Sequence, residues 1–423
     1  MSGPGAASGS RRSFAFVPGP QQSDVMHLAR PALRALVAGA GLAVGLSLAG
    51  VPNAYADSTL VVPEKATTLT VAGEGGGHGH GLSQYGANAA AKRGLSTDQI
   101  LRHYYPGTAG GRAAGEIRVL LSTRPSLVVR RRSGLVASVV GGRRWRLTHL
   151  PSSAARKARQ WAITPVSATV NRLSYRKGGH WKSFRVVSGQ LQFSAGGAPV
   201  RLVAGADSGT FRGALRSAQT SPAGADRDIV NVVRLEDYVK GVVPNEMPAL
   251  WAPAALRAQA IAARTYAVHE RATVHRGWFD VYDTTLSQVY RGSGSQRRAS
   301  DRAVDATRRR ILTYGGRPAF TQFSSSNGGW MLGSAGYPYL RSGRDVYDPV
   351  RRWSTTVSVR ALHDRFLSAY PLGSITERTY PNAGGWVQSV VFTSVDGRHA
   401  NTVPADTFRA WAGLKSGSFR FGG

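Results

Sequence analysis

The sequence predicts an α+β fold, in which a mixed α/β domain carries an inserted antiparallel β domain. Three observations lead to this expectation. Helix formers and alanines dominate residues 253–268, which predicts a buried helix. Residues 116–225 instead contain short β-rich runs separated by glycine turns. Strand and helix patterns alternate again over residues 226–423, so we expect this part and the segment 57–115 to form the mixed domain.

The chain of 423 residues is strongly basic, with a formal net charge of +31, and it contains no cysteine. The lack of cysteine excludes disulfides, Cys-ligated metals and thiol nucleophiles. Most of the basic residues are Arg, a bias typical of coding in a high-GC genome such as an actinobacterial one. A basic surface attracts polyanions in general, including nucleic acid, anionic polymers and membrane surfaces. No helix-turn-helix or RNA-binding signature accompanies the charge, so we expect no specific nucleic-acid partner.

The N-terminal part resembles an export signal rather than a folded domain. Residues 1–25 are rich in Gly, Ser, Pro and Arg and are expected to be a disordered leader, or to be untranslated if synthesis starts at Met26. Residues 26–56 combine two arginines, an apolar run over 35–51 and a small-residue cleavage site that ends at Ala56. This order predicts a secretory signal peptide cleaved after Ala56, and an uncleaved anchor is the alternative. We therefore expect an exported protein that meets the membrane only through this peptide.

A glycine- and histidine-rich motif marks the segment 57–115. Glycines allow the backbone to approach a ligand closely or to adopt a positive φ. One helix over residues 82–92 and a second one that ends before Pro106 are expected to follow. His78 and His80 alternate with glycine, so an extended loop would place both on one side. Two His without a third ligand are weak evidence for a metal, and we expect no metal and no cofactor.

Residues 116–225 are expected to form the inserted β domain. Short β-rich runs occupy residues 117–121, 127–130, 135–140 and 145–147. Hairpin turns are predicted at Ser133-Gly134, Gly141-Gly142, Gly178-Gly179 and Gly196-Gly197. Basic runs lie at residues 130–132, 143–144 and 156–159, with Trp145, Tyr175 and Trp181 near them in sequence. This pattern indicates either a polymer-binding surface or a solvated basic face over an aromatic core, and the second is the simpler interpretation.

Glu246 is the carboxylate with the most unusual sequence surroundings. It lies between Pro244 and Pro248, which predicts a rigid loop because proline restricts its own φ and the preceding residue. Its neighbours include the apolar Met247 and Trp251. Burial among such residues raises the pKa of a carboxyl group, which is how a carboxylic acid becomes a general acid near neutral pH. The alternative is an ordinary glutamate on a surface loop.

Polar residues within the alanine-rich helix raise a second question. Arg264 and Gln259 lie in otherwise apolar sequence, and a buried Arg needs a carboxylate or carbonyl partner.

The rest of this part is predicted to alternate strands and helices. A strand is expected over 229–233, and a helix over 303–311 with Arg308 to Arg310 at its C-terminal end. The C-terminal elements are expected to be a strand over 386–394, a hairpin turn at Asp396-Gly397, a helix over 404–411 ended by Gly413, and a last strand over 419–421.

Several of these segments resemble one known family. Residues 242–268, with the sequence VVPNEMPALWAPAALRAQAIAARTYAV, resemble the signature of the stage II sporulation protein D family, which includes LytB-type amidase enhancers. Residues 78–108 resemble the family's HGxGMSQYGA…ILxHYYxGT segment, with Leu82 in place of Met. That segment lies near the C-terminus in the family but precedes Glu246 here, so the two would have to meet through folding. Residues 283–290 resemble the D-T-x-x-S-Q-x-Y segment, and residues 323–329 resemble the Ser-Gly loop.

The resemblance implies a function in the bacterial cell wall. In the family, the Glu at the position of Glu246 is the catalytic residue of a peptidoglycan lytic transglycosylase. The resemblance further implies substrate-binding roles for Gln259, Arg264, Tyr266, Ser287, Gln288, Tyr290, Ser324, Ser325 and Ser326, and places His78, His80, Ser83 and Gln84 at the rim of the cleft. The implied partners are peptidoglycan glycan strands, and the protein would be secreted or cell-wall associated. The alternative is a non-catalytic binder that enhances a cell-wall amidase. Zinc is associated with some members through Cys and His, a site that this cysteine-free chain does not have.

The reaction expected from the resemblance needs a single carboxyl group. Glu246 would first protonate the glycosidic oxygen and then, as a carboxylate, take the proton from the MurNAc C6 hydroxyl. Ordinary glycoside hydrolysis uses two carboxylates about 5–10 Å apart, for which Asp237 and Asp283 are the nearest companions in sequence. Gln288, Ser325 and Tyr290 are the candidate dipoles for the developing charge. A nucleophilic serine is a weaker alternative, because no G-x-S-x-G elbow is present.

Overall fold

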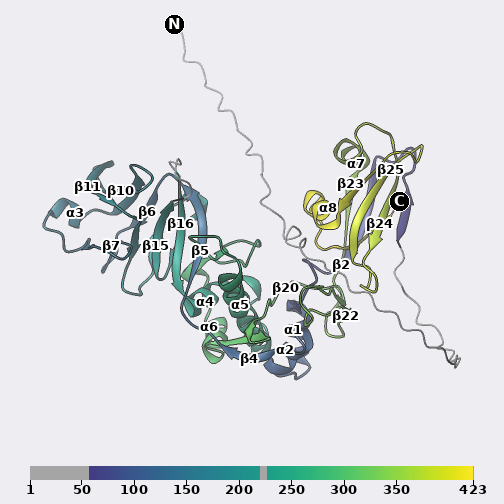
Figure 1. The fold of residues 1–423 in the computed structure, drawn as a ribbon, viewed down its shortest axis with the longest axis horizontal. Coiled ribbons are helices and arrows are strands. Elements are labelled where there is room, and N and C mark those ends of the chain that lie inside the picture. Colours follow the sequence, from purple (N-terminus) through teal and green to yellow (C-terminus); the bar gives the residue numbers. More distant parts are fainter. Residues whose placement is uncertain (1–56, 220–225, 423) are drawn as a thin grey trace, which may run out of the picture. The chain divides into compact units, whose positions relative to one another are not determined.

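The computed structural model describes residues 57–219 and 226–422, so the predicted leader and signal peptide lie outside the described residues. Helices and strands alternate through the described part, with eight α-helices and several separate sheets (Figure 1). The α+β prediction is confirmed. Within these residues, no helix combines the length and apolar character that crossing a membrane requires.

Two large sheets, antiparallel except at one short edge strand, follow the glycine- and histidine-rich segment. The seven-stranded sheet contains, in spatial order, β17 (Val281–Tyr282), β5 (Glu116–Arg124), β16 (Arg227–Arg234), β15 (Ala214–Gln219), β12 (Leu191–Ser194), β7 (Val136–Val139) and β8 (Arg144–Arg146). The six-stranded sheet contains β11 (His180–Ser188), β10 (Val170–Lys177), β9 (Gln160–Pro165), β6 (Leu127–Arg130), β13 (Val200–Leu202) and β14 (Gly209–Phe211). Alternate residues of these strands are buried, and both sheets contribute to one hydrophobic core.

The seven-stranded sheet continues across residue 226, where we expected the inserted domain to end. Strand β16 lies between β5 and β15 and pairs antiparallel with both. Strand β17 then pairs parallel with the outer edge of β5. Seven of the eight residues of β16 are buried, so this strand needs a hydrogen-bonded partner on each side. The sheet therefore joins the β-rich part directly to the strands that follow it.

Two of the four predicted hairpin turns are confirmed. Gly178-Gly179 joins β10 to β11, and both glycines have the positive φ that a two-residue hairpin requires. Gly141-Gly142 joins β7 to β8. The prediction was wrong for Ser133-Gly134 and Gly196-Gly197, because each connects a strand of one large sheet to a strand of the other. The same glycine-containing turn can join two paired strands or two strands of different sheets. Which strands pair depends on how the two sheets stack.

A group of helices surrounds the long alanine-rich helix α5 (Pro253–Thr273), which begins with Pro253 in its first turn as predicted. The helices that contact it are α1 (Gln84–Lys92), α2 (Thr97–Tyr104), α4 (Leu235–Glu246) and α6 (Arg298–Ala306) (Figure 1). Ser83 caps α1, and Ser96 caps α2 through a reciprocal pair of hydrogen bonds with Gln99. Small side chains on α5 allow this close packing, and all its residues from Ala258 to Glu270 are buried.

The predicted helix over residues 303–311 was wrong at its C-terminal end. Helix α6 ends at Ala306, and residues from Arg310 begin strand β18 (Arg310–Tyr314), which lies between β19 (Arg317–Pro318) and β4 (Ala109–Arg112). Arg309 between them has a φ of 64°. Its N–H donates to Glu236 Oε1 at 2.9 Å. Glu236, which is distant in sequence, therefore stabilises Arg309 in a positive-φ conformation that a non-glycine residue rarely adopts.

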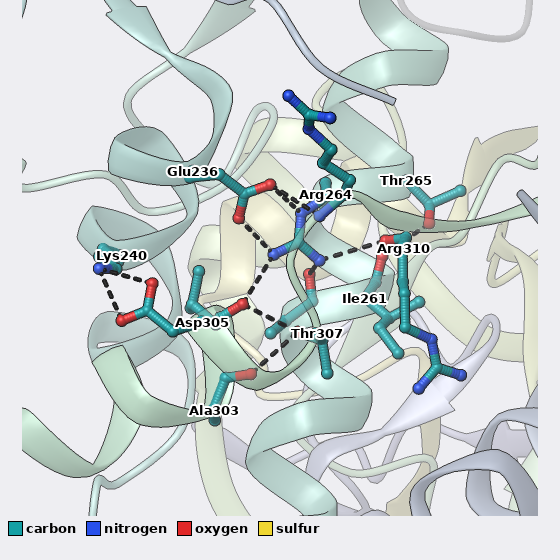
Figure 2. A network of polar contacts seen from close by, with 12 residues as sticks. Glu236, Lys240, Ile261, Arg264, Thr265, Ala303, Asp305, Thr307 and Arg310 are labelled. Carbon is teal, nitrogen blue, oxygen red and sulfur yellow. Dashed lines mark hydrogen bonds and ion pairs between the residues drawn. The ribbon is translucent and has the colours of Figure 1, made fainter. Parts of the chain in front are cut away.

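An ion pair inside this group joins three elements (Figure 2). The fully buried guanidinium of Arg264 donates to both oxygens of Glu236, at 3.1 and 2.7 Å. It also donates to the carbonyl groups of Ala260, Val304 and Arg310. The expectation that Arg264 has a carboxylate or carbonyl partner is confirmed. The pair connects the start of α4 to the middle of α5 and to the segment between α6 and β18.

The C-terminal part has a hydrophobic core of its own. Its sheets contain β1 (Ser58–Val61), β24 (Leu372–Thr379), β25 (Val387–Ser394) and β26 (Ala400–Pro404), and β23 (Arg352–Ser358), β2 (Thr68–Glu74) and β27 (Ser418–Gly422). Its helices are α7 (Val359–Phe366) and α8 (Ala405–Ala412), and Gly413 ends α8 with a φ of 64°. The predicted strands, turn and helix of this part are confirmed. The remaining short elements are α3 (Ser153–Arg156), β3 (Leu82–Ser83), β20 (Phe323–Ser324), β21 (Trp330–Met331) and β22 (Gly343–Arg344).

Replacing Arg264 by Met is expected to destabilise the protein by about 3 kcal/mol, because the partly exposed Glu236 would lose its cation and keep only the N–H of Arg309 as a donor. Urea denaturation followed by circular dichroism would measure the change. Arg257→Met on the same helix is the control, since Arg257 is partly exposed and its side chain donates only to Thr97 in the described structure. Equal losses in the two variants would contradict a special role for this ion pair.

Candidate active site

Glu246 is the last residue of helix α4 and does not lie on a loop, so that prediction was wrong. Pro244 lies inside the helix, although proline lacks the N–H that its turn would use. The buried side chains of Val239, Val242 and Val243 hold the helix against the core. This burial outweighs the lost hydrogen bond, and the helix continues beyond Pro244 as far as Glu246.

The carboxylate of Glu246 accepts hydrogen bonds from two distant segments. Its Oε1 accepts from the backbone N–H of Val289 at 2.8 Å, and its Oε2 accepts from Gln84 Nε2 at 3.2 Å. Burial raises the pKa of Glu246 above its ordinary value, and both hydrogen bonds oppose that rise because they favour the ionised form. The carboxyl of Glu246 therefore keeps its proton to a higher pH than an ordinary glutamate does.

The loop that carries Val289 is held in place by the side chains on either side of it. Gln288 donates to the carbonyl of Ala263 at 3.3 Å and accepts from the Tyr238 hydroxyl at 2.9 Å. Tyr290 donates to Asn231 Oδ1 at 2.7 Å. Both side chains are buried with their polar atoms in interior hydrogen bonds, so the structure does not present them as dipoles for a substrate. The loop instead offers the backbone N–H between them.

A glycine on helix α4 permits this loop to approach. A Cβ atom at Gly241 would lie 2.5 Å from the ring of Tyr290 and 3.0 Å from the carbonyl oxygen of Gly292. The carbonyl of Gly241 also accepts from the backbone N–H of Arg291 at 3.2 Å. Because no side chain separates the helix from the loop, Val289 reaches the carboxylate about one and a half helical turns further on.

The glycine- and histidine-rich segment meets Glu246 through folding, despite its different position in the chain. Strand β3 pairs in parallel with β20, which places Ser83 opposite Ser324. Ser83 is fully buried, caps helix α1, and donates to Asp348 at 2.6 Å. Gln84, the first residue of that helix, is thereby directed at Glu246. Ser83 therefore positions the segment, whereas Gln84 contacts the carboxylate.

The three serines of the Ser-Gly loop have different surroundings. Ser325 is exposed, and its carbonyl accepts from the N–H of Tyr85, the residue after Gln84. Ser326 is buried and donates to Asp348 at 2.9 Å. Ser324 is also buried, and its hydroxyl has no partner among the described residues. Ser325 is thus the serine of this loop that is open to a ligand near Gln84.

Asp345 and Asp348 were missed by the sequence analysis, although they hold these segments together. Asp345 accepts from His103, Tyr104 and Asn327, and both carboxylates are buried. Burial by itself would raise the pKa of Asp345, but the hydrogen bonds keep it below the ordinary value. The sequence signal that could have indicated these residues is the pair of Asp three positions apart in a short run that also contains Arg and Tyr.

His78 and His80 lie together, as the alternation with glycine predicted, but no contact of either with Glu246 is present in the described structure. Their ring centroids are 5.5 Å apart, and His80 Nδ1 bonds to the carbonyl of Leu332 at 2.9 Å. Burial lowers the pKa of His78 to about 3, and it also lowers the pKa of His80. Both rings are therefore neutral at pH 7. Across residues 57–219 and 226–422, no cluster of three His, Asp or Glu side chains is arranged to hold a metal.

The residues of α5 that the family resemblance placed in substrate binding are interior residues in this structure. Arg264 is paired with Glu236, and Tyr266 stacks on Phe320 with ring centroids 5.5 Å apart. Gln259 is fully buried, and neither atom of its amide has a partner among the described residues. Ser287 of the neighbouring loop is half-buried and accepts from the N–H of Tyr282 at 3.2 Å. These residues support the site from within.

Trp251 was named from the sequence only as an apolar neighbour of Glu246, and its contact with Tyr85 was not predicted. Tyr85 follows Gln84, and Trp251 lies five residues after Glu246. Their rings meet edge to face with centroids 4.8 Å apart, and both remain partly exposed. The guanidinium of Arg351 lies 4.4 Å from the Tyr85 centroid. Partly exposed aromatic rings can stack against a flat or apolar face of a ligand.

Glu246 has no carboxylate partner in the described residues. Asp283 pairs with Arg291 at 3.4 Å, and Asp237 lies 3.8 Å from Arg212. Burial raises the pKa of Asp283 to about 6, against the opposing effect of Arg291. Asp283 is thus a second carboxyl with an altered pKa, but it is engaged in its own ion pair.

Comparison with known proteins bears directly on this arrangement. The family model described as Stage II sporulation protein matches residues 224–314, which include Glu246, helix α5 and the loop that carries Val289. Residues 224–314 are therefore similar to this family. The segment that supplies Gln84 lies outside the residues matched, so the matched residues and the rest of the chain build the surroundings of Glu246 together.

Relatives agree with this assignment over limited lengths. A protein named Amidase enhancer from Bacillus subtilis (strain 168) is 40% identical over 134 residues, which cover 30% of this chain and 18% of that protein. Proteins named Stage II sporulation protein D from Bacillus amyloliquefaciens and B. subtilis (strain 168) are 32% and 34% identical over 177 and 146 residues, with 36% and 29% of this chain covered. The chain spans 52% and 42% of their lengths. These likenesses support a function related to the cell wall.

Replacing Gln84 by Ala is expected to raise the pKa of Glu246 further, because a hydrogen bond that favours the ionised carboxylate is removed. Carboxyl carbon NMR over a pH series would measure this, with the resonance assigned by its loss in Glu246→Gln. Asn88→Ala on the same helix is the control, because Asn88 accepts from Ala252 and does not contact Glu246. An unchanged or lowered pKa in the Gln84 variant would contradict the arrangement.

Glu246→Gln is expected to stabilise the protein near neutral pH. Because burial raises the pKa of Glu246 in the folded state, the ionised carboxylate destabilises the fold once the pH exceeds the unfolded value of about 4.3. The gain should therefore be present at about pH 8 and absent at about pH 3, where the group is protonated in both states. Thermal unfolding at both values would test this. Glu236→Gln should change stability in the opposite direction, since Glu236 pairs with Arg264.

Proposed function

We propose that this protein is an exported peptidoglycan lytic transglycosylase, in which Glu246 is the single acid and base. The observation that carries the proposal is the state of that carboxyl group. It lies within the residues that match the Stage II sporulation protein family, its pKa is raised by burial, and two hydrogen bonds hold it from opposite sides.

The proposed reaction uses both protonation states of Glu246. The protonated carboxyl donates its proton to the glycosidic oxygen between MurNAc and GlcNAc as that bond breaks. The resulting carboxylate then accepts the proton of the MurNAc C6 hydroxyl, whose oxygen bonds to C1 and closes the 1,6-anhydro ring. The hydrogen bonds from Val289 and Gln84 stabilise the carboxylate formed after the first step. The cycle ends with Glu246 protonated, and no water is consumed.

The groups around Glu246 suit a glycan strand. Tyr85 and Trp251 offer partly exposed ring faces, and Ser325 offers a hydroxyl close to the Gln84 segment. Stacking and hydroxyl contacts orient a sugar without requiring charge, and Arg351 beside Tyr85 offers a cation for carboxylates on the strand. We therefore expect the strand to pass beside these residues.

The second candidate function is the enhancement of an amidase without catalysis. The relative named Amidase enhancer, 40% identical over 134 residues, favours this alternative. In that case, Glu246 would accept hydrogen bonds from a bound sugar, and a cell-wall amidase would be the partner. The raised pKa of Glu246 favours the catalytic proposal, because a simple acceptor gains nothing from being buried.

Mass spectrometry of glycan products tests the proposal. The protein is incubated with purified peptidoglycan and with strands stripped of peptides, beside the variants Glu246→Gln and Asp283→Asn. Products that end in 1,6-anhydro-MurNAc are expected from the wild type, with at least about a hundredfold loss in Glu246→Gln, the effect of removing a general acid–base group. Asp283→Asn should retain most activity.

Three other outcomes would lead elsewhere. Reducing-end products lost in both variants would identify a hydrolase with two carboxylates. Glycan binding without any product, in the wild type and in Glu246→Gln, would overturn the catalytic proposal and favour the amidase enhancer. Full activity in Glu246→Gln would remove this carboxyl group from the reaction.

A further inference from the structure

The charge of this protein is concentrated in one part of the β-rich region. Residues 117–206 contain 17 Arg and Lys and no Asp or Glu. Of these 17, only Arg118 and Arg124 form ion pairs in the described part of the chain, and both lie at the start of the stretch. The other 15 cations have no carboxylate beside them. A surface of this kind has a strong positive potential, which attracts polyanions from a distance.

Five of these cations line one pocket of about 660 Å³. Arg130 comes from the end of β6, Lys157 and Arg159 from the connection between α3 and β9, and Arg176 and Lys177 from the end of β10. The hairpin glycines that join β10 to β11 complete one side of the pocket. Three segments distant in sequence therefore direct cations at a common space.

One of these cations is held in a fixed orientation. Arg176 donates to Gln160 Oε1 at 3.1 Å and to the carbonyl of Gly179 at 3.2 Å. Gln160 and Gly179 also line the pocket. Neutral acceptors thus orient the guanidinium without neutralising it. A group held in this way binds an anion with a smaller loss of side-chain entropy than a free one.

Protection of a sheet edge does not explain the pocket. Strand β11 is the edge of the six-stranded sheet, and its exposed Lys182 and Arg185 are typical of residues that prevent edge-to-edge association. The five pocket cations lie on three other segments. Like charges gathered around one space repel each other, so their arrangement is destabilising unless an anion enters.

We propose that this pocket binds the phosphate groups of a linear phosphodiester polymer of polyol units. Guanidinium groups bind phosphate oxygens in pairs, and phosphodiesters stay ionised across the physiological pH range. The volume is typical of sites for small groups, about 300–1,000 Å³, and accommodates a short piece of a flexible chain rather than a duplex.

This anchoring site is independent of the chemistry proposed at Glu246. It would keep the protein on an anionic polymer of the wall and leave the glycan-binding groups free. The proposal extends the cell-wall assignment, and a failure of either site can be recognised separately, because glycan cleavage and polymer binding are different measurements.

Isothermal titration of the protein with poly(glycerol phosphate) tests the site. The variant Arg130→Gln/Arg159→Gln removes two pocket cations whose side chains make no hydrogen bond in the described structure. The control Arg143→Gln/Arg144→Gln removes the same charge from the exposed β7–β8 connection of the same region, outside the pocket. The affinity of the pocket variant should fall at least about tenfold, and that of the control less than about threefold.

The salt dependence supplies a second readout. Between about 50 and 200 mM salt, the slope of log affinity against log salt should decrease in the pocket variant by about two, because each removed cation leaves one phosphate without a protein charge beside it. Thermal unfolding checks that both variants fold, and the cleavage of peptide-free glycan should be unchanged in both.

Several results would overturn the proposal. Equal losses of affinity in the pocket variant and the control would mean that net charge alone attracts the polymer. Equal affinity for poly-glutamate of the same charge would remove the preference for phosphate. Equal affinity for inorganic phosphate would identify a small-ligand site, and tighter binding of duplex DNA would assign the surface to nucleic acid. Undetectable binding of poly(glycerol phosphate) to the wild type at about 50 mM salt would also reject the site.

Discussion

The ion pair between the buried Arg264 and the partly exposed Glu236 is the interaction on which the architecture around the candidate site depends. Arg264 lies in the middle of α5, and Glu236 lies in the first turn of α4, the helix that ends at Glu246. Glu236 also accepts from Arg309, where the chain leaves α6 and enters β18. Two charges inside a protein stabilise it only when both are fully paired, so these three segments can adopt one relative arrangement. The carboxyl end of α4 is therefore placed by contacts at the opposite end of the same helix.

Glu246 combines two opposing influences. Burial favours its neutral form, whereas the hydrogen bonds from Val289 and Gln84 favour its charge. Each donor is fixed by buried neighbours: the side chains of Gln288 and Tyr290 anchor one loop, and Ser83 anchors the other segment. A carboxyl group with a raised pKa, whose ionised form is also hydrogen-bonded, suits a reaction that needs an acid and then a base.

The two proposed binding regions differ in the groups that they offer to a ligand. Around Glu246, the ligand-facing groups are aromatic rings, a hydroxyl and amides, with charges nearby mostly paired. In the β-rich region, unpaired cations surround a pocket. The shared seven-stranded sheet, with β16 and β17 next to β5, connects the two regions covalently and through hydrogen bonds. The region around Glu246 thus offers short-range contacts, whereas the β-rich region offers long-range electrostatic attraction.

The sequence by itself determined the elements whose signals are local. The alanine-rich helix after Pro253, the capped helices near Ser83 and Ser96, and the Gly178-Gly179 hairpin follow from propensity, capping and turn chemistry. The family motif also singled out Glu246 and Gln84. Local signals were insufficient where burial overrides them. Pro244 remains within a helix because the core holds its neighbours. Helix α6 ends at Ala306, and Glu236 binds the N–H of Arg309 where the chain turns into β18.

Only the tertiary structure decided which polar groups are available to a ligand. Four residues of the family motifs form hydrogen bonds with interior partners and are not free to bind a ligand. They are Gln288, Tyr290, Arg264 and Ser83. The group that contacts Glu246 from the loop is a backbone N–H, which has no signature in sequence. The cations of the β-rich region are likewise visible in the sequence, but their convergence on one pocket depends on three segments brought together by sheet pairing. Sequence patterns record the type of a side chain, whereas its partners depend on contacts between residues far apart in the chain.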